Sequence, residues 1–142
     1  MERNLFFFIL IVFLAVSGCL HTNQNQEGDR MENDTNENAA IEYKKITQEE
    51  AKKIIDSGNS YILLDVRTQQ EYDEKHIVGA RLIPLDRLRE RAPKELTDKD
   101  ALIMVYCRSG VRSQNASKIL IELGYTNVFD IGGIITWNYE TE

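Results

Sequence analysis

The sequence predicts an α/β domain in which a parallel sheet carries helices on both faces. Three observations support this fold class. From residue 41 onward, short apolar segments alternate with helical patterns. The segment 101–106 (ALIMVY) is apolar throughout, as is typical of a parallel strand covered on both sides. The length of the segment 41–142 is also typical of a single domain.

The first two helices are predicted from the residues that start them. Segments 47–50 (TQEE) and 68–71 (TQQE) are both capping boxes, in which a threonine and a glutamate three positions later satisfy each other's backbone N–H groups. Gly58 is expected to end the first helix. The apolar segment 61–65 (YILLD) then predicts a buried strand between the two helices.

The second half of the domain repeats this alternation. Residues 113–123 (SQNASKILIEL) place apolar side chains on one helical face, and Gly124 is expected to end this helix. The other predicted elements are a loop at 76–80, an extended segment at 81–84, a charged helix at 86–91 and a strand at 127–131.

The N-terminal segment has the pattern of an export signal. Residues 5–16 (LFFFILIVFLAV) form an apolar run of twelve that follows Arg3 and precedes the small residues Ser17 and Gly18. This run is shorter than the roughly 20 residues that a helix needs to cross the hydrocarbon core. Residues 1–18 are therefore predicted to be a signal peptide.

The end of this signal is similar to the lipobox of prokaryotic lipoproteins. The similarity rests on residues 16–19 (VSGC) and implies cleavage before Cys19, which would then carry the lipid. Attached acyl chains hold a protein at a bilayer stably when two or more are present. The alternative is an uncleaved N-terminal anchor in which Cys19 is a small apolar residue. Both interpretations place the rest of the chain outside the cytoplasm, at the outer face of the cell membrane or in the periplasm.

Residues 19–40 are predicted to be a disordered tether. From residue 21 to residue 40 the segment has five acidic residues and one arginine, many Asn and Gln, and almost nothing that could be buried. Its net charge of −4 accounts for most of the −6 of the whole chain. The globular domain is therefore expected to begin at residue 41.

Charge and composition exclude several function classes. The chain has 17 Lys and Arg against 23 Asp and Glu, which argues against a nucleic-acid-binding surface. Its two cysteines cannot form a disulfide framework. His21 and His76 are far apart and show no familiar metal-ligand spacing. We therefore expect neither a metal nor a cofactor.

The chemistry is expected in the loop that follows the central strand. This loop reads 107–113 (CRSGVRS), and ligands of parallel sheets bind at the carboxyl ends of the strands. Backbone N–H groups at a helix N-terminus stabilise an anion, and Arg108 and Arg112 add positive charge that lowers the pKa of a thiol. Cys107 is therefore predicted to be a nucleophilic thiolate. The alternative is a structural cysteine buried inside a strand.

Further motifs accompany this loop, and together they resemble those of the single-domain rhodaneses. The resemblance covers nearly all of residues 41–142 and implies a rhodanese-like three-layer sandwich. The motifs are DVR at 65–67, EY at 71–72, HI at 76–77, GA at 79–80, IP at 83–84, CRSGVRS at 107–113, GG at 132–133 and Trp137.

The resemblance implies a sulfurtransferase. Cys107 would take sulfane sulfur from a small anionic donor, such as thiosulfate, a polysulfide or a persulfide, and pass it to a thiol or cyanide. His76 is expected to shape a loop, because an ionised thiol needs no general base. We expect a monomer. The residues implied to cradle the persulfide and bind the donor are Arg108, Ser109, Gly110, Val111 and Arg112.

Four residues are expected to support the site, namely Asp65, Arg67, Ser113 and Trp137. Asp65 either hydrogen-bonds the catalytic loop or caps the turn after its strand, and Arg67 either pairs with Glu71 or caps the same turn. Trp137 is expected to be a packing anchor near the rim of the site. The chain ends five residues after Trp137, earlier than many members of the family, so a less stable C-terminal edge is expected.

Two other functions stay open. A sulfur-carrier or sensor module at the cell surface would load sulfur on Cys107 without turnover. A cysteine-dependent phosphatase or arsenate reductase would need a wider loop, because four residues separate Cys107 from Arg112 and the tyrosine phosphatases have a longer spacing. The loop also has Arg108 and Arg112 where the mercaptopyruvate sulfurtransferases have other residues. This departure favours thiosulfate, polysulfide or protein persulfide as the donor.

Overall fold

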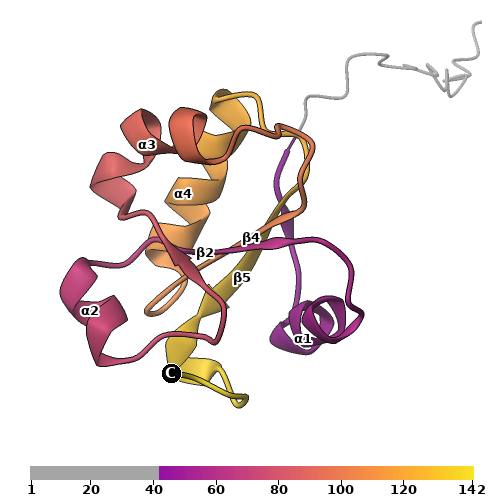
Figure 1. Cartoon of the computed structure of the whole chain (residues 1–142), viewed down its shortest axis with the longest axis vertical. Helices are drawn as coiled ribbons and strands as arrows, with labels where there is room; N and C mark the ends of the chain where they lie inside the picture. Colours follow the sequence, from indigo (N-terminus) through magenta and orange to yellow (C-terminus); the bar gives the residue numbers. More distant parts are fainter. Residues whose placement is uncertain (1–41) are drawn as a thin grey trace, which may run out of the picture. The chain divides into compact units, whose positions relative to one another are not determined.

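The computed structural model describes residues 42–142 (Figure 1). The predicted signal peptide, the lipidation site at Cys19 and the predicted tether lie outside the described residues. Within the range described, no helix combines the length and apolar character that crossing a membrane requires.

A single five-stranded sheet organises the domain. Its strands are all parallel and follow the order β1-β5-β4-β2-β3, as predicted for the central sheet. The middle strand β4 is buried along its whole length, which explains its continuous apolar sequence. The strand bounds are β1 Lys44–Lys45, β2 Ile62–Asp65, β3 Arg81–Leu82, β4 Ile103–Cys107 and β5 Val128–Gly133.

Helices cover both faces of this sheet, which confirms the predicted fold class. Helices α3 and α4 lie on one face and α1 lies on the other (Figure 1). Each face has its own apolar cluster, one around Leu64, Leu88 and Leu120, the other around Ala51, Met104 and Ile131. The helical bounds are α1 Gln48–Asp56, α2 Gln69–Glu74, α3 Leu88–Glu95 and α4 Val111–Glu122, with 3-10 turns at η1 Leu85–Arg87 and η2 Ile134–Thr136.

Both predicted capping boxes are confirmed. In the first box, the Thr47 hydroxyl accepts the Glu50 N–H at 3.2 Å, and the Glu50 carboxylate accepts the Thr47 N–H at 2.7 Å. The second box, between Thr68 and Glu71, has the same reciprocal bonds and starts α2. Gly58 follows the end of α1 with a φ of +73°, as expected for a helix stop.

Several predicted boundaries were wrong, among them those of the strand predicted at 101–106, which spans Ile103–Cys107. Helix α3 continues to Glu95 through Pro93 instead of ending at residue 91, and the Tyr125 hydroxyl lies 2.7 Å from the Ala92 carbonyl oxygen in this last turn. Helix α4 begins at Val111 instead of residue 113, because Gly110 takes a left-handed conformation that turns the chain at once into the helix. Strand β5 continues to Gly133, two residues further than predicted.

The prediction also missed the edge strand β1. Lys44 and Lys45 are exposed and carry no apolar pattern, so nothing local marks them as a strand. They are held by parallel pairing with Phe129 and Asp130 of β5, and the next N–H, of Ile46, bonds the Asp130 carbonyl at 3.1 Å. This strand exists because of a partner distant in sequence.

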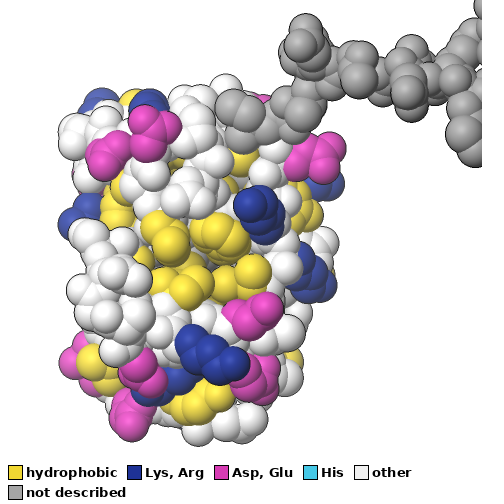
Figure 2. Space-filling view, turned by 90° about the vertical axis from the view of Figure 1, so that its right-hand side faces the viewer, with side chains coloured by type: hydrophobic (Ala, Val, Ile, Leu, Met, Phe, Trp, Pro, Cys, Tyr) yellow, Lys and Arg dark blue, Asp and Glu magenta, His cyan; other side chains and the backbone are white. Residues whose placement is uncertain are grey.

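The face of the sheet under α1 is less completely covered than the other. Partly buried apolar side chains pack there, among them Ile54, Tyr61 and Phe129. Figure 2 views the side of the molecule on which α1 lies and shows hydrophobic side chains gathered in the middle of that surface, with charged side chains around them.

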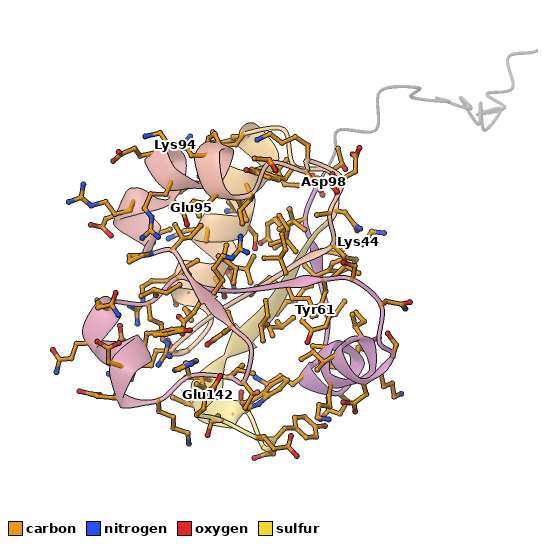
Figure 3. All side chains as sticks on the ribbon, in the orientation of Figure 1. Lys44, Tyr61, Lys94, Glu95, Asp98 and Glu142 are labelled. Carbon is orange, nitrogen blue, oxygen red and sulfur yellow. The ribbon has the colours of Figure 1, made fainter. Side chains whose placement is uncertain are left out.

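The C-terminal residues are tied to the loop after α2. Glu142 and His76 exchange backbone hydrogen bonds of 2.7 and 2.8 Å, and Ile77 forms an antiparallel bridge with Thr141. The Glu142 carboxylate also accepts the Gly79 N–H at 3.1 Å. Figure 3 places Glu142 at the end of the domain where α2 lies. These bonds fix the path of the 76–80 loop, which has the extent predicted.

Candidate active site

Cys107 lies at the carboxyl end of the central strand, where ligands of parallel sheets bind. It is the last residue of β4 and its side chain is 1% exposed. Its Sγ accepts a hydrogen bond from the Gly110 N–H at 3.1 Å. A backbone donor aimed at the sulfur stabilises negative charge there, as a thiolate or persulfide requires.

The loop after Cys107 owes its shape to Gly110. This glycine has a φ of +104° and is the N-cap of α4, so the loop between strand and helix is only three residues long. The positive end of the α4 dipole therefore lies beside the sulfur. Of the residues expected to form the cradle, Arg108 and Ser109 are exposed and Val111 is 67% exposed, so their side chains border the site from outside.

Gly133 supports this loop from the neighbouring strand. A Cβ atom at Gly133 would lie 2.4 Å from the Arg108 carbonyl oxygen and 2.6 Å from the Ser109 Cα. The Ile135 N–H bonds the same Arg108 carbonyl at 3.2 Å. The sequence identified the glycine pair at 132–133 as a sharp turn, but it did not reveal this close approach to the catalytic loop.

Ser113 connects the start of α4 to β5. Its buried hydroxyl lies 2.6 Å from Asp130 Oδ1 and 2.9 Å from the Gly110 carbonyl oxygen. Asp130 Oδ1 also accepts the Gly132 N–H at 3.0 Å. Sequence reasoning missed Asp130, although an acidic residue in an otherwise apolar strand is a signal that could have identified it.

Arg112 forms a bidentate ion pair with Glu71 of α2. Its Nη1 lies 2.7 Å from Glu71 Oε2 and its Nη2 lies 2.6 Å from Glu71 Oε1. These bonds hold the pKa of Glu71 at about 2, against the opposing effect of burial, and bonds from Thr68 contribute. Of the two alternatives for Arg67, the pairing with Glu71 is not formed, because Arg112 of α4 binds this carboxylate.

Arg67 instead pairs with Asp65. The Arg67 Nε and Nη2 lie 2.9 and 2.6 Å from Asp65 Oδ2, and both side chains are buried. Asp65 Oδ1 accepts the Arg67 N–H at 2.9 Å, so Asp65 caps the turn after β2. Within residues 42–142 the Asp65 carboxylate pairs with Arg67, and the alternative of a bond to the catalytic loop is not formed.

The Arg67–Asp65 ion pair also contacts neighbouring residues through the Arg67 guanidinium. The Arg67 Nη2 donates to the Lys75 carbonyl at 2.7 Å, and its guanidinium lies 5.6 Å from the centre of the Tyr106 ring. Burial raises the pKa of Tyr106 far above its usual value, so its hydroxyl stays neutral and accepts the Ile77 N–H at 3.1 Å. The ion pair thereby joins β2 to the segment that follows α2.

An open cleft of about 320 Å³ lies next to the catalytic loop. Within the described part of the chain, the guanidinium of Arg108 has neither a carboxylate nor a hydrogen-bond partner. Ile135 also lines this cleft and is 65% exposed. No group of His, Cys, Asp and Glu residues in this part could hold a metal ion. The lining consists of Arg67, Glu71, Glu74, Lys75, Arg108, Ile134 and Ile135.

Trp137 and His76 lie in packed surroundings. Trp137 is 8% exposed, its indole N–H donates to the Glu140 carbonyl at 3.3 Å, and its ring packs edge-on against Tyr139. His76 stacks on Tyr72 with 3.7 Å between ring centres, and its Nδ1 lies 2.9 Å from the Tyr72 carbonyl oxygen. Both rings are engaged in local packing.

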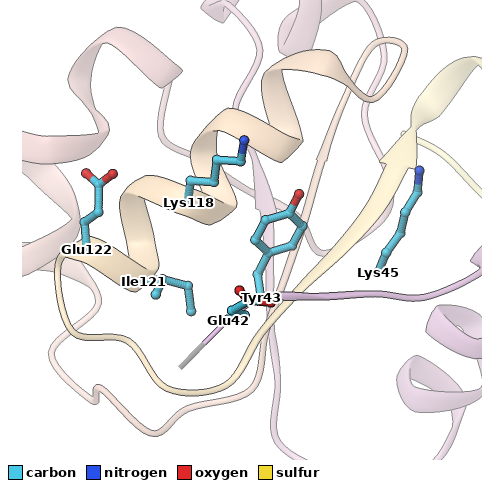
Figure 4. Close-up of a pocket in the computed structure, with 6 residues that line it drawn as sticks. All are labelled: Glu42, Tyr43, Lys45, Lys118, Ile121 and Glu122. Carbon is cyan, nitrogen blue, oxygen red and sulfur yellow. The ribbon is translucent and has the colours of Figure 1, made fainter. Parts of the chain in front are cut away.

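A larger cavity of about 570 Å³ lies along the C-terminal half of α4 (Figure 4). Its charged side chains are two lysines and two glutamates, and no residue of the loop 107–113 lines it. The lining consists of Glu42, Tyr43, Lys45, Lys118, Ile121 and Glu122. Of these two cavities, the smaller one borders the loop after Cys107, through Arg108.

Comparison with known proteins agrees with this geometry. The model of the rhodanese-like domain family matches residues 47–140. The thiosulfate sulfurtransferase PspE of Escherichia coli is 41% identical over 71 residues, which are 50% of this chain and 68% of that protein. The thiosulfate sulfurtransferase GlpE of Coxiella burnetii is 35% identical over 96 residues, which are 67% of this chain and 87% of that protein.

Solved structures show the same likeness. A rhodanese from E. coli, solved with anions, superposes with a TM-score of 0.55 at 35% identity over 58% of this chain and 98% of the other. A rhodanese-related protein from Thermoplasma volcanium superposes with a TM-score of 0.61 at 30% identity over 70% of this chain and 98% of the other.

Proposed function

The chain belongs to the rhodanese-like domain family, and from this premise we propose that it is a sulfurtransferase that carries sulfane sulfur as a persulfide on Cys107. The observation that carries the proposal is the hydrogen bond from the Gly110 N–H to the Cys107 Sγ, at the carboxyl end of the central strand. It gives a sulfur anion a fixed donor before any substrate arrives.

In the first step, the Cys107 thiolate attacks the outer sulfur of the donor. A bond forms between the two sulfur atoms, the S–S bond of the donor breaks, and the leaving group departs with the electron pair of that bond. The leaving group is sulfite when the donor is thiosulfate and a thiolate when the donor is a persulfide. The added sulfur lies next to the loop and the start of α4, where backbone N–H groups stabilise its charge.

In the second step, an acceptor attacks the outer sulfur of the persulfide. The new bond joins sulfur to the acceptor, which is cyanide or a thiol, and the Cys107 thiolate receives the electron pair of the broken S–S bond. Splitting the transfer in this way replaces one difficult reaction with two easier ones. No oxidant or reductant is consumed, because the sulfane sulfur keeps its oxidation state.

Sulfur transfer is better supported than phosphate ester hydrolysis. The relatives named above are thiosulfate sulfurtransferases, and only four residues separate Cys107 from Arg112. In addition, Arg112 forms an ion pair with Glu71, so it can donate fewer hydrogen bonds to a bound phosphate than an unpaired guanidinium could. A carrier or sensor role uses the same persulfide and differs only in turnover.

The test is the intact mass of the purified protein before and after a sulfur donor, and again after cyanide. We expect Cys107 to gain one sulfur atom, cyanide to remove it, and thiocyanate to accumulate over many cycles. Loading without repeated turnover would assign the carrier role instead. Absence of loading with thiosulfate, polysulfide and organic persulfide, together with hydrolysis of a phosphate ester, would replace the proposal with a phosphatase.

We also propose that the protein is exported and held at the outer face of the membrane through a lipid on Cys19. The apolar run at 5–16 and the VSGC sequence at 16–19 support this. In a bacterial host, a labelled fatty acid is expected to enter the wild-type protein and not Cys19→Ala. Labelling of both proteins, or of neither, would contradict the proposal.

A further inference from the structure

The Glu71 carboxylate binds the guanidinium of Arg112 beside the catalytic loop. We propose that this ion pair makes the protein prefer organic persulfides, of the form R–S–SH, over thiosulfate as sulfur donors. The inference rests on the proposed function and narrows its donor class. Glu71 acts through Arg112, so it is a positioning residue that determines specificity.

The ion pair is firmly built. Both guanidinium nitrogens of Arg112 reach Glu71, at 2.7 and 2.6 Å, and the two side chains are only 32% and 25% exposed. Glu71 is held from its other side by the N–H and hydroxyl of Thr68, both at 3.0 Å. Because its pKa is about 2, the carboxylate is ionised at any pH near neutrality. A donor anion must therefore compete with a preorganised carboxylate for Arg112.

Arg112 belongs to the helix whose N-cap, Gly110, donates its N–H to the Cys107 Sγ at 3.1 Å. It lies in the first turn of α4, the helix that begins just after the catalytic loop. Its pKa is raised, mainly by the hydrogen bonds to Glu71 and to a smaller extent by the charge of Cys107. The charge that Glu71 neutralises is therefore one that would otherwise act at the reaction centre.

The three arginines at the site differ in what remains available to a ligand. Arg67 is buried against Asp65, and Arg112 is paired with Glu71. Arg108 is exposed, and no carboxylate in the described part of the chain pairs with it. The cleft is lined by the cations Arg67, Lys75 and Arg108 and the anions Glu71 and Glu74, and Arg112 does not line it. Because Asp65 pairs with Arg67 and Glu71 pairs with Arg112, the remaining charges are those of Arg108, Lys75 and Glu74, which leave one positive charge in excess.

One positive charge suits a leaving group with one negative charge. When the Cys107 thiolate attacks the outer sulfur of R–S–SH, the S–S bond breaks and R–S⁻ leaves with its electron pair, while the S–H proton stays on the transferred sulfur or passes to water. Attack on thiosulfate releases sulfite with two negative charges. Stabilising that dianion would require the guanidinium of Arg112 in addition to that of Arg108, but Arg112 is already paired with Glu71.

The cleft also has apolar side chains that suit an organic group. Ile134 and Ile135 line it, and Ile135 is 65% exposed. These isoleucine side chains can bury the carbon atoms of an organic donor, whereas a small inorganic dianion has no apolar surface to place there.

The first measurement uses the full-length wild-type protein. Its kcat/KM is determined with 2-hydroxyethyl persulfide, whose leaving thiolate carries one negative charge, and with thiosulfate, with cyanide as the common acceptor. We expect the persulfide value to be higher by about tenfold, as the loss of a charged hydrogen-bonding group for sulfite implies. A higher value for thiosulfate would overturn the inference whatever the behaviour of any variant.

The second measurement uses Glu71→Gln, which frees the Arg112 charge and keeps a residue accepted at this position of a capping box. We expect kcat/KM for thiosulfate to rise about tenfold relative to that for the persulfide, mainly through KM, and sulfite to become a stronger product inhibitor. The matched control is Glu50→Gln, the same substitution at the equivalent position of the α1 capping box. It is expected to change neither the donor ratio nor sulfite inhibition.

The outcomes separate this inference from the proposed function. If neither donor loads Cys107, the sulfurtransferase proposal fails. If both donors load it and Glu71→Gln leaves the donor ratio and sulfite inhibition unchanged, only the role of Glu71 fails. A general loss of activity with both donors in equal proportion would assign Glu71 a structural role and would also overturn the inference. If Glu71→Gln does not fold, the wild-type preference still decides.

Discussion

Gly133 and the Arg108 carbonyl oxygen approach each other so closely that no side chain fits between them. A Cβ at Gly133 would lie 2.4 Å from that oxygen, far inside van der Waals contact. Gly133 is also the register partner of Cys107 across β4 and β5. The end of one strand therefore determines where the catalytic loop of its neighbour lies.

Gly133→Ala is expected to push the loop away from β5 and to misplace the Gly110 donor relative to Cys107. A displacement of about 1 Å in a catalytic group can reduce the rate about 100-fold, and overpacking costs about 1–3 kcal/mol of stability. Sulfur-transfer rates and urea unfolding measure the two effects. The control is Gly58→Ala, where φ is +73° but no atom lies within 4 Å, so about 1 kcal/mol of strain is expected without a loss of transfer.

Cys107→Ala is expected to abolish sulfur transfer and persulfide loading. In the proposed mechanism this sulfur forms the covalent intermediate, so no other group can substitute for it. Removing one buried Sγ costs about 1 kcal/mol, and the fold is retained. Intact mass and circular dichroism of the variant check both points. Transfer at the wild-type rate would refute the mechanism.

Asp65→Asn is expected to destabilise the domain by about 3–5 kcal/mol, because it leaves the buried charge of Arg67 without a carboxylate. The free energy of unfolding in urea gives this value. Replacing both residues, as in Asp65→Asn with Arg67→Met, is expected to recover part of the loss, since no charge then remains buried. Equal stability of the single variant and the wild type would mean that the pair contributes little.

Acid is expected to weaken the domain through Glu71. Its folded-state pKa of about 2 lies below the ordinary 4.5, so the stabilisation is complete above pH 4.5 and is lost as the pH falls towards 2. Because both partners are partly exposed, we expect a contribution of about 1–2 kcal/mol. Urea unfolding at pH 5 and pH 3 measures it. Glu71→Gln should lose less stability than the wild type over this interval, and an equal loss would contradict the assignment.

Local signals predicted much of the fold. The two capping boxes and the apolar strand at 101–106 are read from neighbouring residues, and the structure forms α1, α2 and β4 there. The exposed pair Lys44–Lys45 has no such signal, because its strand conformation depends on β5. The charged helix predicted at 86–91 continues to Glu95, where the Tyr125 hydroxyl bonds the Ala92 carbonyl oxygen, a contact between residues distant in sequence.

For the site, the sequence predicted that a short loop leads from Cys107, at the end of a strand, into a helix, but it did not predict the ion pairs. Cys107, Gly110 and the start of α4 follow one another in the chain, so their spacing alone predicts their geometry. Glu71 and Arg112 are 41 positions apart, and only the folded chain determines which arginine reaches which carboxylate. The role of Asp130 could not be predicted for the same reason, because its partner Ser113 lies on another element.

The strand order has a consequence for how the domain is completed. The edge strand β1 comes first in the chain but pairs with β5, the last strand, while β5 separates it from β4. During synthesis, residues 44–45 can therefore pair with the sheet only after β5, and with it nearly the whole domain, has emerged from the ribosome. Such long-range pairing slows folding, and a nascent chain that is cut short before β5 leaves an edge of β4 open to association with other chains.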